Sequence, residues 1–126
     1  MKKVISSPLA PAAVGPYSQA IEANGTLYIS GQLPVDSATG KVADSIEEQT
    51  RQCFCNIEAI LTEAGYSKQD VVKSTVLLDD IANFGAMNAI YGEFYAAPYP
   101  ARVAYQVAKL PLGVKVEIET IAVKSK

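Results

Sequence analysis

The sequence of 126 residues contains no histidine, no tryptophan and only two cysteines. Without histidine, the chain cannot build the Ser–His or Cys–His pairs that activate many enzyme nucleophiles. Cys53 and Cys55 lie two positions apart in a predicted helix, so their side chains point to different faces and do not easily bridge. A thiolate zinc site within one chain is therefore not expected, and we expect buried or half-buried thiols in a reducing compartment.

Long apolar runs and a strong excess of one charge are also missing. No stretch approaches the length of a membrane span, and the N-terminus lacks the apolar run of a secretory signal. The formal net charge of −2 gives no broad basic surface for nucleic acid, and there is no phosphate-binding loop or dinucleotide fingerprint. We expect a cytoplasmic protein with one domain over residues 1–126, without cofactor or metal, that binds neither nucleic acid nor membrane.

Alternating apolar residues and the turn residues between them predict six strands, at 3–6, 17–23, 26–31, 71–78, 101–108 and 114–123. Asn24-Gly25 is a strong hairpin signal between two of these strands. The last two strands are predicted to form a second hairpin around residues 110–113. This hairpin would place Arg102 and Glu117 on adjacent strands.

Two helices are predicted between the strands. The first follows a candidate N-cap at Asp44 or Ser45, carries apolar residues at helical spacing and stops at Gly65. The second spans residues 82–95. The resulting order β-β-β-α-β-α-β-β predicts an α+β fold, a mixed sheet with both helices on one face.

The other face of the predicted sheet carries a mixed set of side chains. In the last strand, Glu117 and Glu119 alternate with apolar residues and point to the same side as Ile121. A mixture of charged and apolar residues suits an interface that encloses a polar pocket better than a bare solvent face. The sequence therefore predicts a homo-oligomer.

Several residues could bind or transform a small anion. Arg102 shares a strand face with small residues, and its guanidinium could hold a carboxylate, although an ion pair with Glu117 or Glu119 is an alternative. A desolvated glutamate at 117 or 119 could act as a general base, whereas exposed glutamates would only solubilise the strand. Tyr17 follows the stiff turn Gly15-Pro16, and its phenol could contact a ligand or pack structurally.

Gly31 and Asn88 complete this set of candidates. Gly31 ends a predicted strand, where glycine allows a ligand to approach the backbone closely. Asn88 is a short amide on the second predicted helix, where it could equally be an ordinary surface residue. With covalent and metal-assisted mechanisms disfavoured by composition, proton transfer and water activation on a small anion remain.

The chain resembles the Rid family (reactive intermediate deaminases, also called YjgF-like proteins), and specifically its RidA type. The segments that carry this resemblance extend over nearly the whole chain: Ala12–Ala20, Ile29–Pro34, Val72–Val76, Asn88–Tyr91, Pro100–Arg102, Leu110-Pro111 and Val116–Glu119. Several independent motifs in the same order make the resemblance specific.

The resemblance implies a chorismate-mutase-like fold and a homotrimer with a central barrel-like core and pockets between subunits. It also implies hydrolysis of 2-imino acids, such as 2-iminobutanoate and 2-iminopropanoate, to 2-keto acids and ammonia without a cofactor. By the same resemblance, Arg102 binds the substrate carboxylate and Glu117 activates water. Tyr17 and Asn88 match pocket positions, and Gly31 matches a backbone contact.

The sequence departs from many relatives directly after the arginine. Those relatives carry Ser-Cys where this chain has Val103-Ala104, so only the backbone of Ala104 could contribute to the site. The pocket is expected to be slightly roomier and less polar, which affects substrate preference more than the reaction. The alternative functions are a non-catalytic trimer that senses 2-keto acids, which would need Arg102 but not Glu117, and RNA cleavage, which the acidic composition disfavours.

Overall fold

The computed structural model of the chain describes residues 1–124. Its longer elements, in chain order, are β1 (Lys3–Ile5), β2 (Ala20–Ala23), β3 (Thr26–Gln32), α1 (Ile46–Glu63), β4 (Val71–Leu78), α2 (Phe84–Phe94), β5 (Ala101–Gln106) and β6 (Val116–Val123). Three short 3₁₀ helices, η1 (Lys68–Asp70), η2 (Ile81–Asn83) and η3 (Pro111–Gly113), lie in the connections. The predicted order of strands and helices is confirmed.

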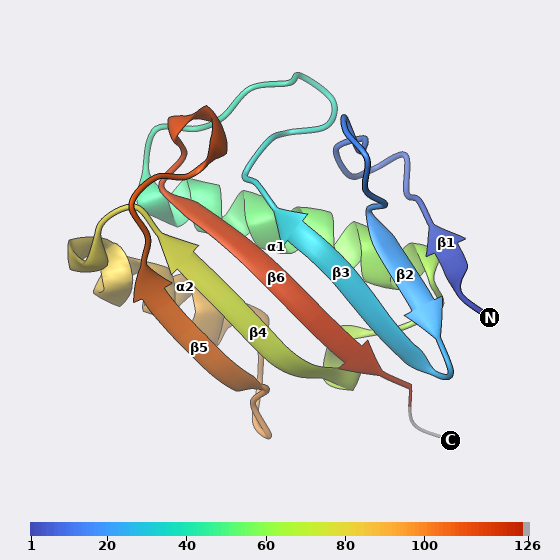
Figure 1. Cartoon of the computed structure of the whole chain (residues 1–126). Coiled ribbons are helices and arrows are strands. Elements are labelled where there is room, and N and C mark those ends of the chain that lie inside the picture. Colours follow the sequence, from blue (N-terminus) through green and yellow to red (C-terminus); the bar gives the residue numbers. More distant parts are fainter. Residues whose placement is uncertain (125–126) are drawn as a thin grey trace.

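All six strands form one mixed sheet in the order β1-β2-β3-β6-β4-β5, and both helices cover the same face (Figure 1). Strand β5 pairs parallel to β4, whereas every other neighbouring pair is antiparallel. Parallel neighbours need a long crossover, and α2 provides it between β4 and β5. The fold is therefore the α+β arrangement expected from the sequence.

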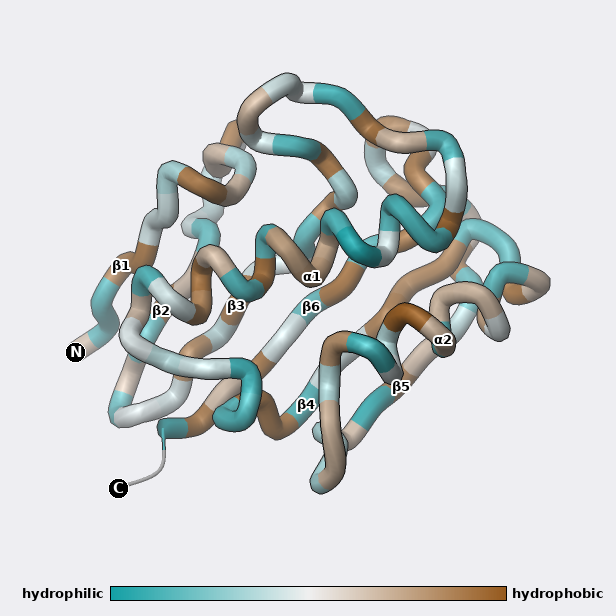
Figure 2. Tube along the Cα trace, turned by 180° about the vertical axis from the view of Figure 1, so that it is seen from behind, coloured by the Kyte–Doolittle hydropathy of each residue, from teal (hydrophilic) through white to brown (hydrophobic). Residues whose placement is uncertain are grey.

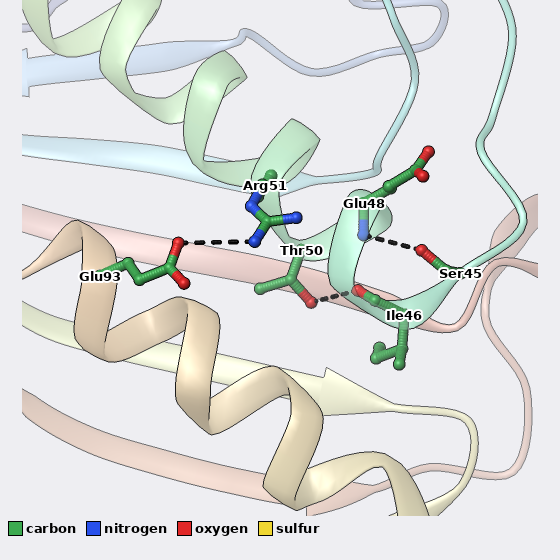
Figure 3. Close-up of polar contacts among 6 residues, drawn as sticks. All are labelled: Ser45, Ile46, Glu48, Thr50, Arg51 and Glu93. Atoms are coloured by element: carbon green, nitrogen blue, oxygen red, sulfur yellow. Dashed lines mark hydrogen bonds and ion pairs between the residues drawn. The ribbon is translucent and has the colours of Figure 1, made fainter.

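Helix α1 begins at the predicted cap. The Ser45 hydroxyl accepts a hydrogen bond from the Glu48 backbone N–H at 3.1 Å (Figure 3). Gly65 follows the helix with φ +78°. An ion pair of 3.6 Å between Arg51 and Glu93 links α1 to α2 at the exposed surface (Figure 3). Exposed pairs of this kind contribute about 0–1 kcal/mol, so packing rather than charge holds the helices in place.

The apolar stripe of α1 packs onto the sheet, as the helical spacing predicts. Cys53, Ile57, Ile60 and Leu61 are fully buried, and they face the alternate buried residues of β6. Seen from behind, both helices lie in front of the strands (Figure 2). One face of the sheet is thus sealed by the core, and the opposite face is left open within the chain.

The predicted second hairpin is wrong. Strands β5 and β6 are not neighbours, because β4 lies between them and pairs with both. Nearly every residue of β5 is exposed, which suits an edge strand, whereas β6 alternates between buried and half-buried or exposed residues and occupies the centre. The loop and turn at 107–115 are long enough to step across β4, since adjacent strands are about 5 Å apart.

Two smaller expectations also change. Strand β2 starts at Ala20 and not at Tyr17. Cys53 is buried as expected, but Cys55 is exposed, so the prediction of a buried or half-buried thiol is wrong for Cys55. Neither α1 nor α2, the two long helices among residues 1–124, combines the length and apolar character needed to cross a membrane.

Candidate active site

A cavity of about 680 Å³ opens on the uncovered face of the sheet, and we call it the glutamate pocket. It lies at one end of the central strands, where the N-terminal loop, the end of β3, η3 and the start of β6 come together (Figure 1). Three of the predicted site residues line it: Tyr17, Gly31 and Glu117. The structure thus brings together residues that are up to 100 positions apart in the sequence.

The carboxylate of Glu117 lies directly against the backbone of Gly31. The register of the β3–β6 ladder shifts between Ile29 and Gln32, and this irregularity contains Gly31. A methyl group built on Gly31 would collide with Oε2 of Glu117 and lie 3.0 Å from its Cδ. Glycine is therefore required at position 31 to leave room for the carboxylate, a close approach that is typical of glycine inside strands.

The pKa of Glu117 is raised above its ordinary value. Burial is the larger cause, because the half-buried site disfavours the charged form, and the negative charge of Glu119 adds to it. No cation forms an ion pair with either glutamate among residues 1–124, where the ion pair found is Arg51–Glu93. A carboxylate with a raised pKa and no cationic partner is well suited to accept a proton from water.

Replacing Gly31 by alanine is expected to reduce any Glu117-dependent activity about tenfold, because the added Cβ displaces the carboxylate and small misplacements are costly in catalysis. Gly31 has no positive φ, so alanine fits the backbone and the protein should still fold. Steady-state rates and circular dichroism would test this together. Gly85→Ala, at an exposed position of α2 with nothing near the new methyl group, is the matched control. Unchanged activity in Gly31→Ala would contradict the positioning role.

Sequence reasoning missed the residue that fixes the loop carrying Tyr17. Gln19 is buried, its Oε1 accepts a hydrogen bond from the Ser7 backbone N–H at 2.7 Å, and its Nε2 donates to the Pro11 carbonyl at 2.9 Å. The Ser30 hydroxyl donates to the Ser18 carbonyl at 2.6 Å and ties the same loop to β3. The only hint in the sequence was a glutamine inside a segment predicted to be a strand.

Arg102 lies in a different cavity, of about 420 Å³, which we call the arginine pocket. Its Nη1 donates a hydrogen bond of 2.6 Å to Oδ1 of Asn88 on α2, and its guanidinium carbon lies 4.7 Å from the centre of the Tyr91 ring. The amide and the ring fix the guanidinium in place, while its remaining N–H groups are free to bind an anion. The structure therefore pairs Arg102 with Asn88, a contact that the sequence did not predict.

The two pockets lie on opposite faces of the sheet. In the ladder, Arg102 pairs with the buried Ser74 and faces α2, whereas Glu117 pairs with Leu77 and faces the open side. The expectation that Arg102 and Glu117 occupy adjacent strands is therefore wrong, and so is the alternative of an ion pair between them within one chain. The inserted strand β4 separates the two residues.

Ala104 does not line either pocket. It is half-buried and its side chain packs against the hydrophobic core, on the same face of β5 as Arg102. Val103 is exposed on the opposite face. The side chains that replace Ser-Cys in this chain therefore point to different sides of the sheet, and only backbone atoms of Ala104 could reach a ligand beside Arg102.

The chain matches the family model described as Endoribonuclease L-PSP over residues 7–124. It is 50% identical to the 2-iminobutanoate/2-iminopropanoate deaminase of Capra hircus, over 98% of this chain and 91% of the goat protein. The crystal structure of RidA from the Antarctic bacterium Psychrobacter superposes with a TM-score of 0.94 at 46% identity, covering 97% of this chain and 99% of the other. The structure of Escherichia coli TdcF with bound serine gives a TM-score of 0.93 at 40% identity, covering 98% and 99%. The match extends over nearly the whole chain, and the protein belongs to the Rid family of YjgF-like proteins.

Proposed function

We propose that this protein hydrolyses small 2-imino acids, including 2-iminobutanoate and 2-iminopropanoate, to 2-keto acids and ammonia. The proposal rests mainly on the carboxylate of Glu117, which lies against Gly31 in the glutamate pocket. The pKa of this carboxylate is raised, and it has no cationic partner among residues 1–124. The deaminase name of the goat relative, at 50% identity, supports the same reaction.

The proposed chemistry requires only water and a general base. The protonated imine carbon is electrophilic, so Glu117 takes one proton from water as the water oxygen forms a bond to that carbon. The resulting amino alcohol then expels ammonia as its C–N bond breaks, and the hydroxyl group gives its proton to water as its oxygen becomes the keto group. Glu117 can return the proton to the departing nitrogen. General-base help of this kind contributes about 10²–10⁴-fold.

Arg102 is proposed to hold the substrate carboxylate. A guanidinium offers two parallel N–H donors that match the two carboxylate oxygens, and Asn88 keeps the fork from rotating. Tyr17 is proposed to place its phenol beside the substrate, while backbone groups of Gly31 and Ala104 contribute hydrogen bonds. These roles make Arg102 and Glu117 the two residues on which turnover depends.

Because these two residues lie on opposite faces of one sheet, we propose that each site is shared between two subunits of a homotrimer. The open face supports an assembly: Tyr28, Val103 and Tyr105 on that face are 50%, 44% and 47% exposed, respectively. Exposed apolar side chains on the same face as Glu117 favour contact with another chain over exposure to water. In a closed ring, the arginine pocket of one copy can then meet the glutamate pocket of the next.

The pH dependence follows from the direction of the Glu117 shift. A general base must be deprotonated, so kcat/KM should fall as the pH decreases through a pKa above the ordinary glutamate value. Glu119→Gln removes the nearby negative charge, and it should move this acidic limb to lower pH. The test is to compare the pH–rate profiles of wild type and Glu119→Gln. Titration of the substrate affects both profiles equally, so a difference between them reports on the enzyme. Coincident profiles would contradict the assignment.

A non-catalytic trimer that binds 2-keto acids is the second candidate. The structure of TdcF, 40% identical to this chain, contains a bound small amino acid, serine. The deciding experiment is to generate 2-iminobutanoate in situ and follow its loss with and without the protein. Acceleration over the uncatalysed reaction supports the deaminase. Binding of 2-ketobutyrate without acceleration would instead support the sensor.

A further inference from the structure

Leu112, in the turn η3, combines two costly features at one position. Its backbone lies in the left-handed region, with φ 60° and ψ 10°, where the Cβ of an L-residue approaches its own carbonyl oxygen too closely. Its side chain is also 76% exposed. Glycine or asparagine would adopt this conformation more easily and would expose less apolar surface. A branched apolar residue that is both strained and exposed is a reason to look for a role in function.

The turn holds Leu112 in a fixed place. Leu110 and Val114, on either side of it, are both buried, and the Gly113 N–H donates to the Leu110 carbonyl at 3.1 Å. The Lys115 N–H donates to Oε1 of the buried Gln49 at 2.8 Å, which ties the end of the turn to α1. Only the tip of the turn projects, and Leu112 is at that tip. The buried flanking residues and these hydrogen bonds therefore fix the position of the Leu112 side chain.

Leu112 lines the glutamate pocket together with other apolar residues. Val14, Leu33 and Val35 line the same cavity, whose charged groups are Glu117 and Glu119. None of the lining residues from this chain carries a positive charge. An apolar substrate side chain would gain contacts here, whereas an anionic one would be repelled by the two carboxylates.

We infer that Leu112 determines substrate specificity, as one wall of a subsite that selects 2-imino acids with extended apolar side chains. This inference rests on the proposed deaminase function and adds to it the part of the substrate that the pocket recognises. The reaction at the imine carbon is the same for every substrate, so Leu112 acts only on the group attached to that carbon. An apolar contact discriminates between side chains without changing the chemistry.

The test compares two imines made in situ from alanine and leucine by an amino-acid oxidase, with O₂ as the oxidant; they carry a methyl and an isobutyl group. Wild type is expected to show the higher kcat/KM with the isobutyl imine. Leu112→Asn should lower the isobutyl-to-methyl ratio about tenfold, the size expected when one apolar contact in a pocket is lost. Leu112→Met keeps an apolar side chain of similar size and should retain most of the ratio.

The matched control is Leu9→Asn, the same change at another exposed leucine that lies outside the glutamate pocket. It should leave the ratio unchanged. Since asparagine tolerates the left-handed conformation, Leu112→Asn should also keep or raise Tm and preserve the oligomer. A change in selectivity without a loss of stability is a result that a purely structural role of Leu112 would not give.

Three results would overturn the inference: an unchanged ratio in Leu112→Asn, an equal loss on both imines, or a lower Tm with dissociation of the oligomer. The last would show that Leu112 serves subunit packing. These results differ from a failure of the proposed deaminase function itself. In that case wild type would accelerate the hydrolysis of neither imine, and both proposals would be contradicted. Acceleration by wild type with an unaltered ratio would remove the specificity role alone.

Discussion

Replacing Glu117 by glutamine is expected to slow imine hydrolysis by about 10²- to 10⁴-fold, the usual contribution of a general base. Glutamine keeps the size of the side chain and its fit against Gly31, but its amide cannot accept a proton from water. The loss should appear mainly in kcat, because Arg102, in the other pocket, is proposed to hold the substrate carboxylate. Measuring kcat and KM separately would therefore assign the role of Glu117.

The same substitution should stabilise the protein. Glu117 has a higher pKa in the folded chain than in the unfolded chain, so its ionised form opposes folding above that pKa. This unfavourable contribution disappears as the pH falls below the unfolded pKa, where the group is protonated in both states. Glu117→Gln should accordingly have a higher Tm than wild type near neutral pH, with the difference shrinking in acid.

Glu58→Gln serves as the control for both effects, since Glu58 is an exposed residue of α1 on the other side of the sheet. It should change neither the rate nor the Tm near neutral pH appreciably. A Glu117→Gln protein that keeps wild-type kcat would contradict the general-base assignment. An inactive Glu117→Gln protein with a much lower Tm would instead indicate a structural role.

Replacing Arg102 by alanine is expected to lower kcat/KM by about 100-fold. Two charged hydrogen bonds to the substrate carboxylate, at about 1.5 kcal/mol each, correspond to a loss of this size. Most of it should appear as a higher KM, because the carboxylate is bound in the ground state as well as in the transition state. Kinetics over a wide range of substrate concentration would separate the two parameters.

Arg102→Lys tests the geometry of this contact. Lysine keeps the positive charge but loses the planar fork, the hydrogen bond to Asn88 and the stacking over Tyr91. It should recover only a small part of the lost affinity. Arg51→Ala, which removes the exposed ion pair with Glu93, is the control and should behave like wild type. Full activity in Arg102→Lys would mean that charge alone suffices.

The fold could be predicted largely from local features of the sequence. The N-cap at Ser45 and the stop at Gly65 delimit α1 because caps and glycine act over a few residues. The alternation in β6 gives the buried and open faces correctly. The pairing of the strands could not be predicted in the same way. Strand β4 lies between β5 and β6, and no local sequence pattern indicates this order.

The sequence offered candidate site residues but not the geometry that relates them. Glu117 and Gly31 are in contact. Arg102 lies on the opposite face of the sheet, because it pairs with the buried Ser74 of β4 and its side chain therefore points toward α2. The role of Gln19 depends on hydrogen bonds to carbonyl groups up to 12 positions away, which the residue type alone does not reveal. The left-handed conformation of Leu112 was equally invisible, because leucine is not a residue that favours it.

In the proposed homotrimer, each site takes Arg102 from one subunit and Glu117 from another. We would mix equal amounts of Arg102→Ala and Glu117→Gln, unfold and refold them together, and measure imine hydrolysis beside refolded wild type and each variant alone. A shared site is intact when one subunit supplies an unmutated Arg102 and its neighbour an unmutated Glu117. With random assembly from equal amounts, this holds for about one quarter of the sites, so the mixture should have about one quarter of wild-type activity. Activity in the mixture no greater than in the separate variants, although mixed oligomers form, would contradict the shared site.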